Sequence, residues 1–221
     1  MSTEPQPVEI GALGLKGLLG APSAARGLVV FAHGSGSGRL SPRNNTVARA
    51  LRASGLATLL LDLLTPEEER RRANVFDIPL LADRLSLATQ WATEQSETAP
   101  LSIGYFGAST GAGAALAAAA DDSRVSAIVS RGGRPDLAGD ALPHVRAPTL
   151  LIVGGLDEPV IELNRVARQR LKAESQMVVV PGATHLFEEP GALDQVVDRA
   201  ARWFLRHLAR AERRPDVQRQ E

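Results

Sequence analysis

The chain has 221 residues, which suits one domain, and 44% of them are hydrophobic, a proportion typical of a globular protein with a single core. Lysine plus arginine and aspartate plus glutamate each number 25, so the formal net charge is zero. This balance argues against a protein that binds nucleic acid through a basic surface. The chain has no cysteine, which excludes disulfides, thiolate nucleophiles and cysteine-based metal sites.

The first ten residues, MSTEPQPVEI, do not place a basic segment before an apolar stretch, so we expect no signal peptide. Nowhere does an apolar run approach the length of about 18 residues needed to cross a bilayer. We therefore expect a cytoplasmic protein without a membrane partner. The sequence leaves its oligomeric state, monomer or dimer, open.

Short apolar runs that are typical of strands alternate with longer segments of helical periodicity. The predicted strands lie, in chain order, at residues 8–21 (one or two strands joined by a turn), 27–32, 57–61, 101–106, 125–130, 149–153 and 176–180. The predicted helices lie at residues 46–53, 77–94, 109–120, 162–171 and 192–208. The charged segment 63–75 fits a solvated loop or a helix end.

Most of these strand runs are continuously apolar, which is typical of parallel strands covered on both faces. We therefore predict an α/β fold, a three-layer αβα sandwich with a mostly parallel sheet. The domain is expected to span residues 1–209. Residues 210–221 lack apolar content and are expected to form a disordered basic tail. Asp77 is a plausible N-cap, and Asn44 and Asn45 are expected to cap the helix that follows them.

Residues 107–111, GASTG, match the pattern G-x-S-x-G between a predicted strand and a predicted helix. A nucleophile elbow requires this strand–turn–helix context, because its serine takes a strained conformation between small neighbours. The helix N-terminus would also direct free N–H groups at charge that develops beside Ser109. The simpler alternative is a turn in which Ser109 caps the helix.

Residues 33–38, HGSGSG, follow the buried strand that ends near residue 32. Such a glycine-rich loop lets backbone N–H groups approach a ligand closely, but it lacks the Lys-Ser/Thr ending of a phosphate-binding loop. We interpret it as half of an oxyanion hole, with the N–H of Ser35 as one donor and the N–H of Thr110 as the other. A flexible turn is the alternative.

A nucleophilic serine needs a general base, and His185 suits that role best of the four histidines. It follows the last predicted strand and comes after Ser109 in the chain. The orienting acid is expected between them, at another strand end, where Asp157 fits. Glu158 is its neighbour and competitor, although it suits the start of a helix, and Asp136 is the next candidate.

These motifs together resemble an α/β-hydrolase, of the small, lidless kind that is similar to dienelactone hydrolases. The resembling residues are FAHGSGSG at 31–38, GYFGASTGAG at 104–113, GGLDEPV at 154–160 and PGATHLF at 181–187. The resemblance implies that Ser109 is the nucleophile, Asp157 the acid and His185 the base. It also implies that the N–H groups of Ser35 and Thr110 form the oxyanion hole.

The chain departs from dienelactone hydrolases in one respect, because their nucleophile is a cysteine and this chain has none. A serine esterase is therefore favoured, and Ser109 also excludes the aspartate nucleophile of dehalogenase relatives. Only residues 131–148 separate two predicted strands where many relatives carry a helical cap. We therefore expect no cap domain and an open cleft.

Three arginines, Arg39, Arg43 and Arg131, lie beside predicted strand-end loops. Each could bind a carboxylate or phosphate of a substrate, and each could instead form a structural salt bridge.

The sequence thus predicts a serine hydrolase that cleaves small carboxylic esters, thioesters or lactones through an acyl-enzyme, with no metal and no cofactor. Its partner is expected to be a small-molecule ester rather than a nucleic acid. Acyl transfer or amide cleavage on the same triad, and a non-catalytic binding module that keeps the fold, are the alternatives.

Overall fold

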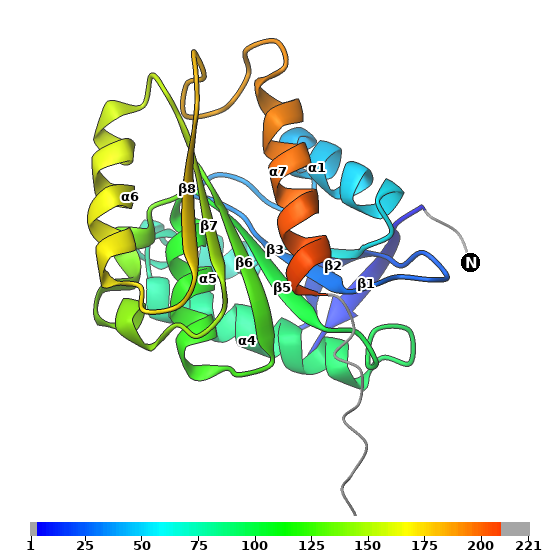
Figure 1. The fold of residues 1–221 in the computed structure, drawn as a ribbon. Helices are drawn as coiled ribbons and strands as arrows, with labels where there is room; N and C mark the ends of the chain where they lie inside the picture. The colour runs from blue at the N-terminus through cyan, green and yellow to red at the C-terminus, as the bar shows by residue number, and fades with distance from the viewer. Residues whose placement is uncertain (1–3, 209–221) are drawn as a thin grey trace, which may run out of the picture.

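The computed structural model describes residues 4–208. These residues form a central sheet with helices on both faces (Figure 1). The tail expected at residues 210–221 lies outside the described residues.

The sheet has eight strands in the order β1-β2-β4-β3-β5-β6-β7-β8. Their bounds are β1 (Gln6–Ile10), β2 (Leu15–Gly20), β3 (Leu28–Ala32), β4 (Ala57–Leu61), β5 (Ile103–Ala108), β6 (Val125–Arg131), β7 (Thr149–Gly154) and β8 (Ser175–Val180). The β1–β2 and β2–β4 pairs are antiparallel and all the others are parallel. The predicted mostly parallel sheet is confirmed.

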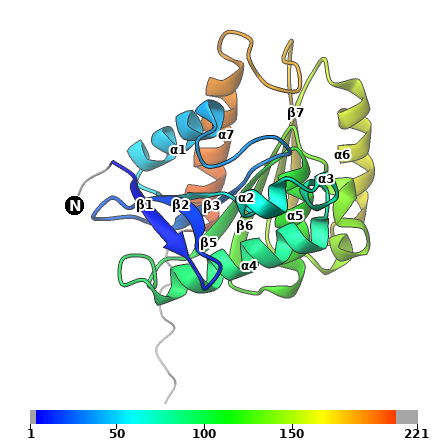
Figure 2. The same cartoon turned by 180° about the vertical axis from the view of Figure 1, so that it is seen from behind.

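Helices cover both faces of the sheet, as Figures 1 and 2 show from opposite sides. One face is covered by α1 (Pro42–Ala53) and α7 (Ala192–His207), and the other by α4 (Ile78–Glu94), α5 (Thr110–Asp121) and α6 (Glu158–Arg170). Each face has its own hydrophobic core, because continuously apolar strands such as β3 present side chains to both sides.

In the N-terminal half of the chain, the start of helix α1 and the residue that caps it differ from the sequence predictions. Helix α1 begins at Pro42, four residues earlier than expected, and Ser41 is its N-cap. Asn44 and Asn45 therefore lie in its first turn, and their predicted role as caps is wrong. Proline suits this start because its missing N–H is not needed there. Asp77 does cap α4, where its carboxylate accepts the Leu80 N–H at 3.0 Å.

The charged segment after β4 forms two short helices, α2 (Pro66–Glu69) and α3 (Arg72–Val75). Thr65 and Glu68 form a capping box at the start of α2, with each side chain accepting the other residue's backbone N–H. The segment is largely exposed, as expected of a solvated region. It also lies across the carboxyl end of β4, which places it next to the site described below.

Between β6 and β7 the chain forms only the 3₁₀ helix η1 (Pro135–His144). The prediction of no cap domain is thus confirmed. Within residues 4–208, none of the helices combines the length and the apolar character that crossing a bilayer requires. Because no cap covers them in the described part of the chain, the carboxyl ends of the parallel strands share one open edge of the sheet, which is the upper edge in Figure 1. Ligands of open parallel sheets bind at such edges.

Candidate active site

Ser109 stands alone between the end of β5 and the start of α5, with φ 50° and ψ −123°. A positive φ is strained for any residue with a side chain, and such strain typically marks functional sites. The sharp turn also requires its glycines. A Cβ atom on Gly107 would lie 2.5 Å from Ala112 Cα, and one on Gly111 would lie 2.2 Å from the carbonyl oxygen of Ala32. The local geometry is that of a nucleophile elbow.

His185 and Asp157 come together at the ends of the neighbouring strands β7 and β8. Their contact is a hydrogen bond in which His185 Nδ1–H donates to Asp157 Oδ2 at 2.7 Å. Nε2 is thereby left for a second partner. The side chain of Asp157 is 15% exposed and that of His185 is 38% exposed. The two alternative candidates for the acid have other positions or partners. Glu158 starts α6, and Asp136 binds the Arg134 guanidinium through two hydrogen bonds.

A second strained residue holds the histidine loop in place. Phe187 has φ 56° and a buried ring. A Cβ atom on Gly132 would lie 3.3 Å from that ring and 3.6 Å from His185 Cε1. The backbone of Gly132 therefore closely approaches both residues of the loop. Because the Ser109 N–H donates to the carbonyl of Arg131 at 3.4 Å, this contact brings the loop to the elbow.

No hydrogen bond joins the Ser109 hydroxyl to the His185 ring in the described part of the chain. Catalytic hydrogen bonds of free enzymes are often long and tighten only when substrate binds. The structure therefore brings His185 onto Asp157 and into the neighbourhood of Ser109, without closing the last contact.

The glycine-rich loop after β3 faces the start of α5. A Cβ atom on Gly34 would lie 2.9 Å from Ser109 Cβ, so this loop passes directly beside the serine. The N–H of Ser35 donates to Thr110 Oγ1 at 3.0 Å. The two residues predicted to supply the oxyanion hole are thus in contact, but the Ser35 N–H already has an acceptor.

Two side chains hold this loop against the end of β4. The Leu63 N–H donates to His33 Nε2 at 3.0 Å, so Nδ1 carries the proton of this ring and donates to the carbonyl of Gly34 at 2.9 Å. Asp62 accepts the Arg39 N–H at 2.7 Å through Oδ1, and its Oδ2 forms an ion pair with the Arg39 guanidinium. His33 and Asp62 therefore both link the glycine-rich loop to the residues at the end of β4.

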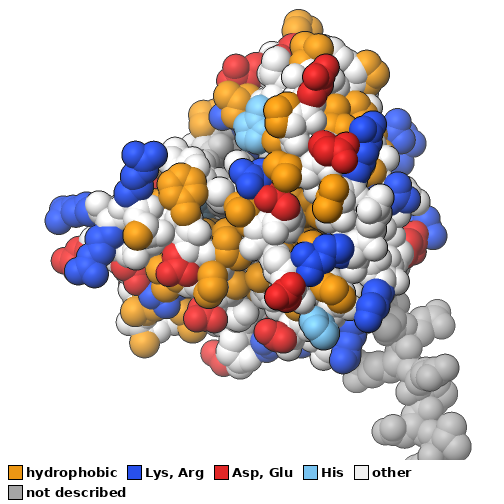
Figure 3. All heavy atoms as spheres, turned by 90° about the vertical axis from the view of Figure 1, so that its left-hand side faces the viewer, with side chains coloured by type: hydrophobic (Ala, Val, Ile, Leu, Met, Phe, Trp, Pro, Cys, Tyr) orange, Lys and Arg blue, Asp and Glu red, His pale blue; other side chains and the backbone are white. Residues whose placement is uncertain are grey.

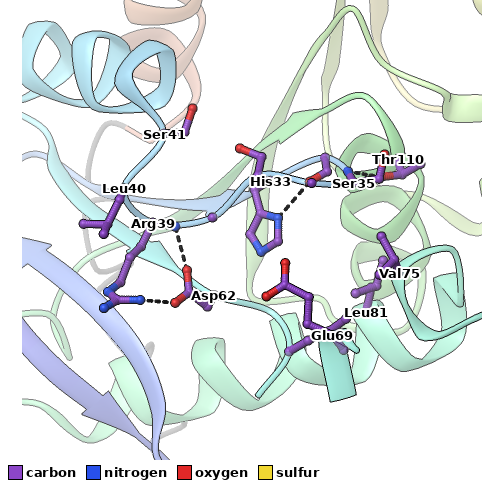
Figure 4. Close-up of a pocket in the computed structure, with 15 residues that line it drawn as sticks. His33, Ser35, Arg39, Leu40, Ser41, Asp62, Glu69, Val75, Leu81 and Thr110 are labelled. Carbon is purple, nitrogen blue, oxygen red and sulfur yellow. Dashed lines mark hydrogen bonds and ion pairs between the residues drawn. The ribbon is translucent and has the colours of Figure 1, made fainter. Parts of the chain in front are cut away.

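A cavity of about 220 Å³ opens beside the loop (Figure 4). Ser35 and Thr110 line it, so it adjoins the predicted oxyanion hole. Its apolar wall is formed by Leu64, Val75 and Leu81. Asp62 and Glu69 also line it, and Figure 4 shows the Glu69 carboxylate pointing into the cavity.

The three arginines that were candidates either for binding an anion or for a structural salt bridge differ in the partners that the structure gives them. Arg39 pairs with Asp62, as described above, and Arg43 Nη1 pairs with Glu188 Oε1 at 2.7 Å. Arg131 is the last residue of β6, and its side chain has no ion pair with any described carboxylate. Arg39 and Arg43 thus form the salt bridges that were the alternative to anion binding, whereas Arg131 forms no salt bridge with a described carboxylate.

Burial, and secondarily the charge of Arg43, lower the pKa of Arg131 to about 10. The guanidinium therefore still carries its charge at neutral pH. Its Nε and Nη1 atoms are buried without a hydrogen-bond partner, and its Nη2 donates to Asn44 Oδ1 at 3.4 Å.

The sequence motifs do not single out Asp62 or Glu69. Asp62 had a recognisable signal, because a charged residue directly after a buried parallel strand lies at the edge where sites form. Glu69 belongs to a mixed run of charges and has no such signal. Within residues 4–208, no three His, Asp or Glu side chains lie close enough to hold a metal ion.

A comparison with models of known protein families shows to which family the chain belongs. A model described as an alpha/beta hydrolase domain matches residues 25–209. The chain therefore belongs to the α/β-hydrolase family.

Two solved structures illustrate the range of its similarity. A crystal structure named as dienelactone hydrolase from Anabaena variabilis is 56% identical, with a TM-score of 0.88 over 93% of this chain and 99% of that one. The esterase Est1E from Butyrivibrio proteoclasticus is 16% identical, with a TM-score of 0.77 over 92% of this chain and 98% of that one. The second likeness concerns the fold alone.

Curated relatives from two strains of Mycobacterium tuberculosis are 62% identical over 202 residues. Their names assign them provisionally to the phosphoribosyl transferases. The match covers 91% of this chain and 46% of each relative, so the chain spans about half the length of these proteins.

Proposed function

We propose that the chain is a serine hydrolase that cleaves small carboxylic esters, thioesters or lactones through an acyl-enzyme. The observation that carries this proposal is the contact of His185 Nδ1 with Asp157 Oδ2 at 2.7 Å, at the strand ends next to the strained Ser109. Membership of the α/β-hydrolase family supports it.

In the proposed reaction His185 Nε2 takes the Ser109 proton while Oγ attacks the ester carbonyl. The C–O bond to the leaving alcohol then breaks, and His185 returns the proton to that alcohol. Water repeats the sequence on the acyl-enzyme and releases the carboxylic acid. Asp157 holds the ring in the tautomer with a proton on Nδ1 and stabilises the imidazolium.

The charge on the carbonyl oxygen would be stabilised by the N–H groups of Thr110 and Ser35. In the structure the Ser35 N–H donates to Thr110 Oγ1. On this proposal the substrate oxygen takes over that hydrogen bond, and Thr110 Oγ1 keeps the donor in place until the substrate arrives.

The substrate is expected to be small, because the cavity beside Ser35 and Thr110 holds about 220 Å³. A lactone belongs to the proposed range because the 56% identical structure is named as a dienelactone hydrolase. Any such reaction would use Ser109 in place of the cysteine that the resemblance to dienelactone hydrolases implies, since this chain has no cysteine.

Labelling with a fluorophosphonate probe, followed by peptide mapping, tests the nucleophile. The expected result is one labelled peptide that contains Ser109. A panel of p-nitrophenyl esters of increasing chain length, with one thioester, one lactone and one anilide, then tests the substrate class. Hydrolysis of the anilide or acyl transfer to an added alcohol would indicate an amidase or an acyltransferase. Absence of labelling at Ser109 would contradict the proposal and favour a binding module.

A further inference from the structure

Arg131 is a buried cation for which the described part of the chain provides no counter-charge. The residue is 8% exposed, and two of its three guanidinium nitrogens are buried without a hydrogen-bond partner. Burying a charge is costly unless it is paired and hydrogen-bonded. Within residues 4–208 no carboxylate forms an ion pair with it. The arrangement points to an anion that these described residues do not supply.

The position of Arg131 links this cation to the nucleophile. In the β5–β6 register Arg131 lies opposite Ala108, the residue before Ser109. Its carbonyl accepts the Ser109 N–H. The backbone of Arg131 therefore lies directly beside the turn that carries Ser109.

The surroundings of the guanidinium are electropositive. Its Nη2 contacts Asn44, in the first turn of the 12-residue helix α1, where the helix dipole places partial positive charge. Arg43, in the same turn, lies close enough for its charge to lower the pKa of Arg131. The N-terminal turn of α1 thus lies against the guanidinium, and a second cation, paired with Glu188, lies nearby.

We propose that Arg131, Arg43 and the first turn of α1 form a subsite for an anionic group, carboxylate or phosphate, of the substrate. The assignment as a substrate subsite rests on the proposed hydrolase function, whereas anion binding itself does not. Arg43 would exchange Glu188 for the incoming anion, since that ion pair is largely exposed and such pairs are weak. The arginine fork suits either oxyanion group.

Binding is tested without catalysis. Melting temperature is measured against added inorganic phosphate and, separately, acetate, at constant ionic strength. The wild-type chain and an Arg131→Met variant are compared, with Arg165→Met as the control, because Arg165 lies on the exposed surface of α6. The subsite predicts that at least one anion raises the melting temperature of the wild type and of Arg165→Met but not of Arg131→Met. Equal shifts in all three chains, or no shift in the wild type, would overturn it.

Three aryl acetates with the same acyl group then test selectivity: phenyl acetate, 4-acetoxybenzoate and 4-acetoxyphenyl phosphate. Arg131→Met is expected to raise KM about 10- to 100-fold for the carboxylate or the phosphate ester and to leave phenyl acetate unchanged. Arg131→Lys should recover part of the loss, which guards against a folding defect. An equal loss on all three esters would assign Arg131 a structural role. If no ester is cleaved but anions still bind through Arg131, the hydrolase proposal fails and the anion site stands.

Discussion

The charged side chains on the two sides of Ser109 differ in whether they are paired within the protein. On the side of the glycine-rich loop, Asp62 is paired with Arg39 and also accepts a backbone N–H of the loop. On the side of β6, Arg131 is more deeply buried and, among the described residues, has neither a carboxylate partner nor a full set of hydrogen-bond acceptors. The first arrangement holds the protein's own backbone, whereas the second is complete only with an anion from outside.

The comparison shows why three similar arginines cannot be assigned one role. An arginine that meets a carboxylate of its own chain has already offset the cost of its burial. An arginine that meets none keeps its hydrogen-bonding capacity for a ligand. The following substitutions test this difference.

The largest effect is expected at Ser109, which both sides share. Ser109→Ala should lower kcat by about 10³-fold or more for every ester, because it removes the atom that forms the acyl-enzyme. Anion binding through Arg131 should persist in this variant, as measured by the phosphate-dependent melting temperature. Near-native hydrolysis of p-nitrophenyl acetate by the alanine variant would show that another residue is the nucleophile.

Asp157→Asn is expected to lower kcat by about 10²- to 10⁴-fold, because an amide next to His185 Nδ1 stabilises the wrong ring tautomer. Glu158→Gln serves as the matched control, and it should cost less than about 3-fold because Glu158 starts α6. Both variants should keep the circular dichroism spectrum of the parent. If Glu158→Gln were the impaired variant, the acid would have to be reassigned.

Asp62→Asn tests the paired side directly. It weakens the hold on the loop that carries the Ser35 N–H, so kcat should fall about 10- to 100-fold for neutral and anionic esters alike, with KM little changed. This pattern is the reverse of the one expected for Arg131→Met. Glu67→Gln is the control, since Glu67 is exposed on the neighbouring helix α2 and does not line the cavity. A selective effect of Asp62→Asn on anionic esters would contradict the division between the two sides.

The smallest effect is expected at His207, at the end of α7 and remote from both sides. Burial lowers the pKa of His207, so the folded state binds this proton less readily than the unfolded chain does. Its contribution to stability is therefore present above the unfolded pKa of about 6.5 and is lost as pH falls through the lower folded value. His207→Gln should flatten the acid limb of the stability curve, by less than about 0.5 kcal/mol. Urea unfolding between pH 5 and 8 measures it, and an unchanged slope would show that His207 does not titrate differently on folding.

Much of the fold follows from patterns that are local in the chain. Continuous apolar runs such as residues 57–61 have the same meaning wherever they occur, because a strand covered on both faces cannot alternate polar and apolar residues. The elbow around Ser109 was equally local, since its glycines are adjacent to the strained serine in sequence. The start of α1 was missed because Ser41 and Pro42 follow a glycine-rich loop that hides the helical periodicity.

Contacts between residues that are far apart in the chain could not be predicted from the sequence. Chain order suggested Asp157 and His185, but only the packing of β7 against β8 brings their side chains to 2.7 Å. Likewise Asp62 meets Arg39, and Arg43 meets Glu188, across 23 and 145 positions of the chain.

The sequence by itself determined the fold class, the order of the elements and the residue types available for chemistry, because periodicity and motif spacing are properties of neighbouring residues. Only the tertiary structure decided which charges are paired, since pairing depends on which strand ends and helix turns meet in space. In this structure Arg131 is buried beside Ser109 without a described counter-charge. The free-energy cost of burying an unpaired charge is what points to an anionic ligand.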